Sequence, residues 1–330
     1  MDNKSPERSI IQKLKEVCNR SGFIPGEGIG DDAAFLLTSS LEHNKLVITT
    51  DSIVENVHFK QSWSSWSDVA TKLFEMNLSD LYVKGAVPHW ALLNINCDHN
   101  FMNHGIEEFA DKLGELFFKF NIALIGGDTT ASATNTFSLT MLGVASEYLY
   151  RKNNTIEKGD LIVQCGQIGG SNYGMEMLKK EIPISESIKS KYTAPRAQRN
   201  IKWLFDLKAK ATIDQSDTLF ETLEILSKEN NIEMEIEIDK INIVPELSIN
   251  KPPFIPVENY CRQILQSSED LSIIAILPGQ MKEKAEQIKD INIIGKVGNI
   301  GKEYLSLVYQ DKSMNEIINK NLIFNHFDIF

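Results

Sequence analysis

The sequence predicts an α+β protein with two domains, and three observations support this prediction. Strand-like and helix-like segments alternate through the first half of the chain. A polar stretch at 151–160, RKNNTIEKGD, has the composition of a loop between domains. In the second half, helices and strands interleave without a strict βαβ repeat, which favours a mixed sheet. We therefore expect one domain over 1–150 and a second over 151–330.

The first half contains four strand-like runs and two helix-like segments. The strand-like runs are rich in Val, Ile, Leu and Thr, whereas apolar residues recur at helical spacing in the helix-like segments. In chain order we expect a strand at 45–50, a helix at 66–84, a strand at 92–97, a helix at 106–120, and strands at 122–127 and 136–147.

The second half opens with LIVQCG, a predicted strand that runs into the glycine-rich segment GQIGG and then into a helical pattern. Ser171 is the expected N-cap of this helix, because a serine hydroxyl can accept a hydrogen bond from a free backbone amide. Further helices are expected at 195–208, 217–230, 257–266 and 280–288. Further strands are expected at 232–238, 271–277, 291–297 and 304–309.

Composition excludes several classes of protein. The 330 residues are 42% hydrophobic, which suits a chain that buries a sizeable core. A formal net charge of −11 argues against non-specific nucleic-acid binding. No stretch is apolar enough to span a membrane, and the first residues lack the apolar core of a secretion signal, so we expect a cytoplasmic protein. The four cysteines lie far apart and are expected to be buried thiols: Cys18, Cys97, Cys165 and Cys261.

Five segments place aspartates beside turn-forming or hydroxyl residues. They are GIGDDAA at 28–34, TTDS at 49–52, NLSD at 77–80, GGDTT at 126–130 and DQSD at 214–217. Each alone is also what a helix cap or a turn requires. TTDS and GGDTT follow apolar runs, so we expect their aspartates at strand ends, where open α/β sheets form ligand crevices. Gathered carboxylates and hydroxyls favour magnesium, and magnesium in turn favours phosphate substrates.

Common nucleotide-binding motifs are missing from the sequence. It contains no GxxxxGK[ST] loop, no HRD or DFG pair and no GxGxxG after a strand. GQIGG at 166–170 could bring backbone amides to a phosphate or could be a plain tight turn, and the sequence leaves both interpretations open.

The order and spelling of the motifs resemble the thiamine-monophosphate kinases. The motifs that carry the resemblance are GIGDDAA, TTDSIVENVHF, NLSDLYVKGAVP, LIGGDTT, YR, KGDLIVQCGQIGG, PR, IDQSD and SSED, from about residue 28 to the C-terminus. The wider superfamily also contains aminoimidazole ribonucleotide synthetase, selenophosphate synthetase and a hydrogenase maturation protein. The resemblance implies that the first half forms a β-barrel with a second subunit in a homodimer and binds ATP and Mg²⁺. The second half is then a helix-covered sheet that completes the nucleotide and substrate site.

The resemblance also implies a set of site residues. The implied magnesium ligands, for several ions, are Asp32, Thr49 or Thr50, Asp51, Asp80, Asp128, Asp214 and Asp217. The implied ATP contacts are Asp32, Gly127, Asp128, Arg151 and Ser216. The implied contacts with thiamine monophosphate are His58, Glu269 and Phe327. The reaction implied is in-line transfer of the ATP γ-phosphoryl group to thiamine monophosphate, with no covalent nucleophile.

The second half departs from the family pattern at two places. The family's DxSDGL has a glycine where this chain has Thr218, and its GGED is here Ser267, Ser268, Glu269 and Asp270. A β-branched residue adopts positive φ with difficulty, so a turn that requires positive φ would have to differ here. Two other functions therefore stay open: an ATP-using enzyme of the same superfamily with a different acceptor, and a nucleotide-binding relative without catalysis.

Overall fold

The chain folds into two compact units. A computed structural model describes residues 34–37, 44–249, 252 and 254–317. Unit 1 comprises the described residues up to Tyr148 together with Thr193–Ala197, and unit 2 comprises Leu149–Tyr192 and the described residues from Gln198 onward. Within the described residues, the chain therefore leaves unit 2 once, contributes five residues to unit 1, and returns. None of the helices within the described ranges is long and apolar enough to cross a membrane.

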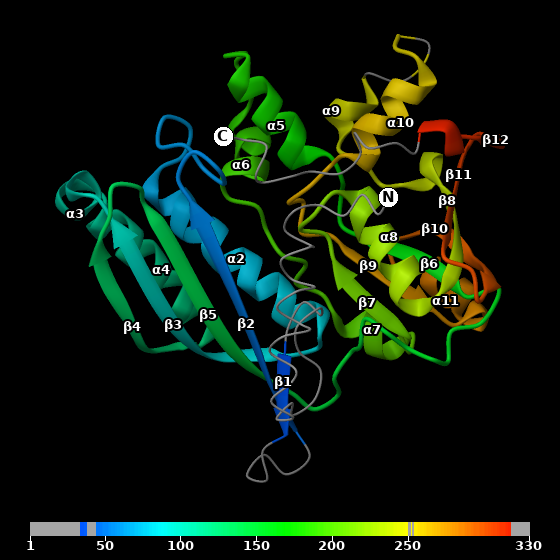
Figure 1. Cartoon of the computed structure of the whole chain (residues 1–330), viewed down its shortest axis with the longest axis horizontal. Helices are drawn as coiled ribbons and strands as arrows, with labels where there is room; N and C mark the ends of the chain where they lie inside the picture. The colour runs from blue at the N-terminus through cyan, green and yellow to red at the C-terminus, as the bar shows by residue number, and fades with distance from the viewer. Residues whose placement is uncertain (1–33, 38–43, 250–251, 253, 318–330) are drawn as a thin grey trace, which may run out of the picture. The chain divides into compact units, whose positions relative to one another are not determined.

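Unit 1 is built on a five-stranded mixed sheet with the strand order β1-β2-β5-β3-β4. Its strands are β1 (Ala34–Leu37), β2 (Lys45–Val54), β3 (Val87–Cys97), β4 (Ala123–Ala131) and β5 (Thr136–Ala145). β3 and β4 are parallel, whereas β5 pairs antiparallel with both β2 and β3. The sheet is open, with β1 and β4 at its edges, and Figure 1 shows β2, β5, β3 and β4 in this order.

One face of this sheet is covered by α2 (Trp66–Val83) and α4 (Ile106–Phe120), whose positions confirm the helices predicted there. α2 begins at Ser65, which forms a capping box with Asp68. Phe137 of β5 is fully buried on the covered face, where its ring stacks on Phe109 of α4 at 4.7 Å between centroids. The short helix α3 (His99–His104) adds Phe101 to this aromatic cluster.

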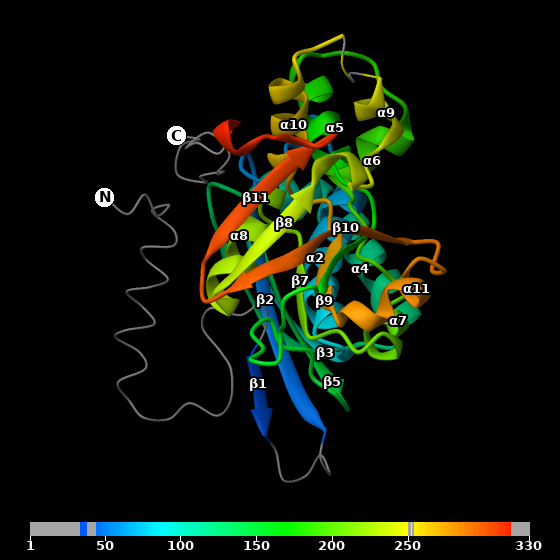
Figure 2. The same cartoon turned by 90° about the vertical axis from the view of Figure 1, so that its right-hand side faces the viewer.

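Unit 2 is built on a seven-stranded mixed sheet with the order β12-β11-β8-β10-β6-β9-β7. Its strands are β6 (Leu161–Cys165), β7 (Ala211–Asp214), β8 (Ile232–Glu237), β9 (Ile273–Leu277), β10 (Ile291–Ile300), β11 (Tyr304–Tyr309) and β12 (Lys312–Ser313). Only the β8–β11 pair is parallel among its described pairings. Figure 2 shows β11, β8 and β10 side by side. The mixed sheet predicted for the second half is confirmed.

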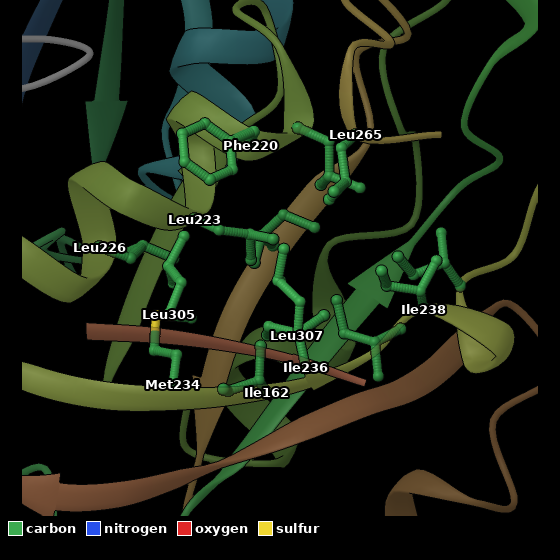
Figure 3. Packing of buried hydrophobic residues seen from close by; sticks show 14 of the residues in the cluster. Ile162, Phe220, Leu223, Leu226, Met234, Ile236, Ile238, Leu265, Leu305 and Leu307 are labelled. Carbon is green, nitrogen blue, oxygen red and sulfur yellow. The ribbon is translucent and has the colours of Figure 1, made fainter. Parts of the chain in front are cut away.

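The helices and 3₁₀ turns of unit 2 are mostly short. They are α5 (Gly170–Lys179), α6 (Glu186–Thr193), α7 (Lys202–Asp206), α8 (Leu219–Asn230), η3 (Ile238–Lys240), α9 (Pro245–Ser248), α10 (Val257–Leu265), η4 (Gly279–Met281), α11 (Lys282–Ala285) and η5 (Asn315–Ile317). Buried side chains of α8, β8 and β11 form the centre of the core, as Figure 3 shows for Leu223, Ile236 and Leu307.

Four predictions about these elements are wrong. The helix expected at 195–208 is only α7, because residues 193–197 lie against unit 1 instead. The helix expected at 280–288 shrinks to η4 and α11. Ser171 lies inside α5 and does not cap it, because Gly169 occupies the N-cap position. Asp51 and Asp128 lie within β2 and β4, not at strand ends, because the pairing of both strands continues past them.

Candidate active site

On the covered face of the unit 1 sheet, Thr49, Asp51 and Asp80 form one group. Thr49 and Asp51 are two residues apart on β2, so their side chains point to the same side of the sheet. This is the side of α2, where the Thr49 hydroxyl donates a hydrogen bond of 2.5 Å to Oδ2 of Asp80. The motifs TTDS and NLSD are thus joined by a direct contact across 31 residues of sequence.

Thr50 and Asp128 belong to the opposite, helix-free face. The Thr50 hydroxyl is hydrogen-bonded to Thr140 of β5 at 2.8 Å. Strand register places Asp128 opposite Asn94, which in turn lies opposite Ser138. Since directly opposite residues share a face, the structure separates Asp128 from Thr49, Asp51 and Asp80. The structure brings Thr49, and not Thr50, to another predicted ligand.

Gly127 precedes Asp128 on β4 and has a backbone conformation that requires glycine. Its φ is 155°, and a Cβ built there would collide with the carbonyl oxygen of Leu93 on β3. Every residue of β4 is exposed, including Asp128. The backbone at Gly127 and the Asp128 carboxylate are therefore open to a ligand.

His58 is held at two points. The backbone amide of Val54 donates to Nδ1 of its ring at 3.1 Å, and the Lys72 ammonium donates to its carbonyl oxygen at 2.8 Å. Because Nδ1 accepts a hydrogen bond, the ring proton of the neutral imidazole lies on Nε2. His58 can therefore offer an N–H to a substrate oxygen.

Two fully buried charges on α2 were not predicted from the sequence. Besides Lys72, Glu75 is completely buried and accepts hydrogen bonds of 3.0 Å from the Arg196 guanidinium and from the Ala197 amide. These bonds fasten residues 193–197 to unit 1. The available signal was a charged residue on the apolar side of a predicted helix, together with the PR pair at 195–196.

In unit 2, the segments 214–217 and 267–271 lie side by side. The Glu269 amide donates to the Ser216 carbonyl at 2.9 Å, and the Leu271 amide donates to the Gln215 carbonyl at 3.2 Å. Glu269 adopts a left-handed φ of 55° in this arrangement. The structure thus brings Asp214, Ser216 and Asp217 together with Glu269, as predicted site residues of two distant motifs.

Asp270 occupies the N-terminus of α5. Its carboxylate accepts hydrogen bonds from the amides of Gly169 at 2.7 Å and Ser171 at 2.9 Å. Of the two interpretations of GQIGG, a turn is therefore favoured over a phosphate cradle, because a protein carboxylate already uses these amides. Burial raises the pKa of the Asp270 carboxyl from 3.8 to about 6, and the hydrogen bonds from Ser171 and Gly169 oppose part of that rise.

Thr218 fits the position where the family has glycine, because the turn does not need positive φ. Its φ is −60°, and it is the N-cap of α8, where its hydroxyl accepts a hydrogen bond from the Glu221 amide. The hydroxyl also contacts the Glu221 carboxylate at 3.0 Å. Neither Ser267 nor Ser268 has a positive φ, so these two positions do not require the glycines of the family pattern. The Ser268 hydroxyl donates to the Asn172 side chain at 3.0 Å.

Arg151 forms an ion pair in unit 2. Its guanidinium donates two hydrogen bonds to the Glu229 carboxylate, at 2.8 and 2.9 Å, from a position that is almost completely buried. If Arg151 contacts ATP as predicted, its guanidinium would have to bind the nucleotide while it is also paired with Glu229. The remaining predicted residues, Asp32 and Phe327, lie outside the described residues, as does Cys18. Cys97, Cys165 and Cys261 are buried free thiols, as predicted.

The donor chemistry of the predicted ligands in each unit suits magnesium. Thr49, Asp51 and Asp80 in unit 1 offer hydroxyl and carboxylate oxygens, the ligands that Mg²⁺ prefers, and Asp214 and Asp217 in unit 2 offer carboxylate oxygens. Within the described part of the chain, no three His, Cys, Asp or Glu side chains converge closely enough to hold a metal by themselves.

A cavity of about 580 Å³ lies in unit 1 beside the ends of β3 and β4. It is lined by residues 97–99, Met102 and residues 129–133. None of the predicted site residues lines it, although Thr129 follows Asp128 directly.

Comparison with known proteins agrees with this fold. Residues 30–145 match the family of "AIR synthase related protein, N-terminal domain". The chain is 30% identical to the thiamine-monophosphate kinase of Buchnera aphidicola subsp. Acyrthosiphon pisum, with 98% of this chain and 100% of the relative covered. It is 26% identical to the thiamine-monophosphate kinase of Leptospira interrogans, covering 97% and 100%. Its fold is similar to a structure of AaThiL complexed with AMPPCP and TMP, at 24% identity and a TM-score of 0.77, covering 93% and 94%.

Residues 30–145 are thus similar to the N-terminal domain of AIR synthase-related proteins. Over its whole length, the chain belongs to the thiamine-monophosphate kinase family.

The N-cap at Thr218 leads to a stability prediction. Thr218→Val keeps the shape of the side chain but removes the hydroxyl, so the free energy of unfolding should fall by about 1 kcal/mol. Urea denaturation measures this change. Thr222→Val is the matched control, because that hydroxyl only returns to the Thr218 carbonyl within the helix and its loss should cost less than about 0.5 kcal/mol. Equal losses in the two variants would contradict the cap.

The raised pKa of Asp270 leads to a prediction about pH. A folded-state pKa above the unfolded value means that the stabilisation is fully present below about pH 4 and is lost as the pH rises through about 6. Asp270→Asn removes this titration. Between pH 4 and 6, the free energy of unfolding of the native protein should therefore fall relative to that of the variant. Urea denaturation at several pH values tests this, and parallel pH curves would contradict it.

Proposed function

We propose that this chain phosphorylates thiamine monophosphate with ATP and Mg²⁺, giving thiamine diphosphate and ADP. The observation that carries the proposal is the 30% identity to a thiamine-monophosphate kinase over the full length of that relative. The site geometry supports it through the Thr49–Asp80 contact in unit 1 and the joined segments 214–217 and 267–271 in unit 2.

The chemical task is to align two polyanions for in-line transfer. The acceptor is a phosphate oxygen that is already anionic, so little general-base help is needed and no covalent nucleophile is assigned. Mg²⁺, held by the carboxylate and hydroxyl oxygens named below, would neutralise the negative charge that develops during transfer. The protein's own contribution is to fix the positions of both phosphates.

The residues proposed for nucleotide and metal binding come from both units. The proposed magnesium ligands are Asp32, Thr49, Thr50, Asp51, Asp80, Asp128, Asp214 and Asp217. Thr49 is favoured over Thr50, because Thr49 contacts Asp80. The proposed ATP contacts are Asp32, Gly127, Asp128, Arg151 and Ser216, and Gly127 is supported by a backbone that only glycine can adopt.

The residues proposed to bind thiamine monophosphate are His58, Glu269 and Phe327. The structural support for His58 is the hydrogen bond of Val54 to Nδ1, which fixes the ring and places the proton of the neutral imidazole on Nε2. Glu269 is supported by its left-handed backbone, a conformation that non-glycine residues adopt most often where a site or turn requires it. A cytoplasmic location is part of this proposal, and cell fractionation tests it.

A direct assay tests the reaction. The purified protein with Mg²⁺, ATP and thiamine monophosphate should form thiamine diphosphate, and chelation of the metal should stop it. Asp51→Asn and Asp128→Asn should each remove most turnover without loss of folded structure, because each removes one carboxylate from the proposed metal set. Asp111→Asn, the same change at an exposed position of α4, is the matched control and should stay active.

The outcomes separate the alternatives. Near-normal activity of both Asp51→Asn and Asp128→Asn would contradict the assignment of these carboxylates as magnesium ligands. ATP consumption without thiamine diphosphate would indicate a different acceptor. Nucleotide binding without any turnover would indicate a non-catalytic relative.

We further propose that the chain forms a homodimer through the helix-free face and edge of the unit 1 sheet, closing a barrel with its partner. Large apolar side chains are exposed there on β3 and β4: Val87, Trp90, Leu92, Leu124 and Ile125. An exposed apolar edge strand is an aggregation hazard unless another chain covers it.

The dimer is tested by mass in solution. The 37.3 kDa chain should sediment at twice its mass, and Leu92→Glu should shift it toward the monomer, because a charge would be buried in the interface. Phe118→Glu is the matched control, since Phe118 is 91% exposed on α4, which covers the other face. If the native protein is a monomer, or if Leu92→Glu remains a dimer, the proposed interface is wrong.

A further inference from the structure

The side chain of Gln215 joins the two segments that carry the unit 2 site residues. Gln215 is fully buried between Asp214 and Ser216, in the segment assigned to metal and nucleotide binding. Its Nε2 donates hydrogen bonds of 2.7 Å to the carbonyl of Asp217 and 2.7 Å to the carbonyl of Ser267. Its Oε1 accepts a hydrogen bond of 3.2 Å from the amide of Asp270. Both N–H groups of the amide are therefore used: one bonds within the segment 214–217, and the other crosses to the segment 267–271.

The backbone of Gln215 extends the same connection. Its amide donates to the Ser272 carbonyl at 2.8 Å, and its carbonyl accepts from the Leu271 amide at 3.2 Å. Four residues along, the Leu219 amide donates to the Ser267 carbonyl at 2.8 Å, so this carbonyl receives hydrogen bonds from both Gln215 and Leu219. A change at this one side chain therefore reaches both segments.

The residues on either side of Asp270 show what these bonds hold in place. Glu269 and Leu271 have φ values of 55° and 51°, a conformation that costs non-glycine residues about 1 kcal/mol or more each. Such a backbone persists only where surrounding contacts fix it. Here the contacts come from Gln215, Ser216 and the Asp270 carboxylate on α5.

We infer that Gln215 is a positioning residue that couples the nucleotide segment 214–217 to the substrate segment 267–271. The inference rests on the proposed function for the identity of the two ligands. If Gln215 transmits position between the segments, ligand bound to one segment should order the other, and removing its amide should weaken both binding sites together.

Gln164 provides a matched control within the same unit. It is also a buried glutamine, on β6 whereas Gln215 directly follows β7, and it also makes three hydrogen bonds. Its Nε2 donates to the carbonyls of Gly166 and Asn242, and its Oε1 accepts from the Asn242 amide. None of its partners is a proposed site residue. Met is close in length to Gln but cannot hydrogen-bond in the same way, so Gln164→Met and Gln215→Met remove equal numbers of bonds.

The kinetic test compares the KM and kcat of these two variants, whose melting temperatures should fall by similar amounts because each loses the same number of hydrogen bonds. Gln215→Met should raise the KM for both ATP and thiamine monophosphate, with kcat/KM falling by about ten-fold to a hundred-fold. Gln164→Met should stay within about two-fold of the native protein. Equal kinetic losses in both variants would overturn the coupling, since a structural role alone predicts them. Gln215→Glu, which keeps the size and Oε1 but loses the amide donors, replaces Gln215→Met if that variant does not fold.

Hydrogen exchange on the native protein gives an answer that does not depend on turnover. ADP with Mg²⁺ alone should slow amide exchange in 267–271 as well as in 214–219. Protection confined to 214–219 would overturn the inference. If the native protein makes no thiamine diphosphate, the proposed function fails, yet the same exchange measurement on Gln215→Met still decides the inference: protection of 267–271 by ADP should be lost in that variant, and its persistence would overturn the role of Gln215.

Discussion

The pairing of segment 214–217 with segment 267–271 is the constraint on which the unit 2 site depends. Neither segment is regular secondary structure along most of its length, so their shape comes from hydrogen bonds between them. Those bonds hold Glu269 in a strained backbone and place Asp270 at the start of α5, while Thr218, next in sequence, caps α8. Three segments that are far apart in sequence thereby become one arrangement.

Much of the framework could be predicted from local sequence. The helices α2 and α4 were predicted at their observed positions, because each has a long apolar repeat and a clear start. The strand β11 was also predicted at its observed bounds. The short strand β7 was not predicted, because four residues are too few to show an alternation.

The site was less predictable, because its geometry depends on partners that are distant in sequence. The glycines before Asp128 suggested the end of a strand, yet pairing with β3 carries β4 through them. Thr49 and Thr50 are adjacent in sequence, and only the position of α2 shows which of them meets Asp80. The identity of the family was carried by motif order, whereas the roles of Gln215, Lys72 and Glu75 depend on contacts that no local pattern encodes.

Residues 193–197 belong to unit 1 but are encoded between two stretches of unit 2, which affects how the gene could be divided by recombination. Cutting the gene after the codon for Tyr148 would deprive unit 1 of Arg196 and the Ala197 amide, and would leave the Glu75 carboxylate buried without these partners. The first half is therefore not a self-sufficient cassette that recombination could move into another gene. To keep the partners of Glu75, a transferred gene segment would have to run through the codon for Ala197, and so would carry part of unit 2 with it.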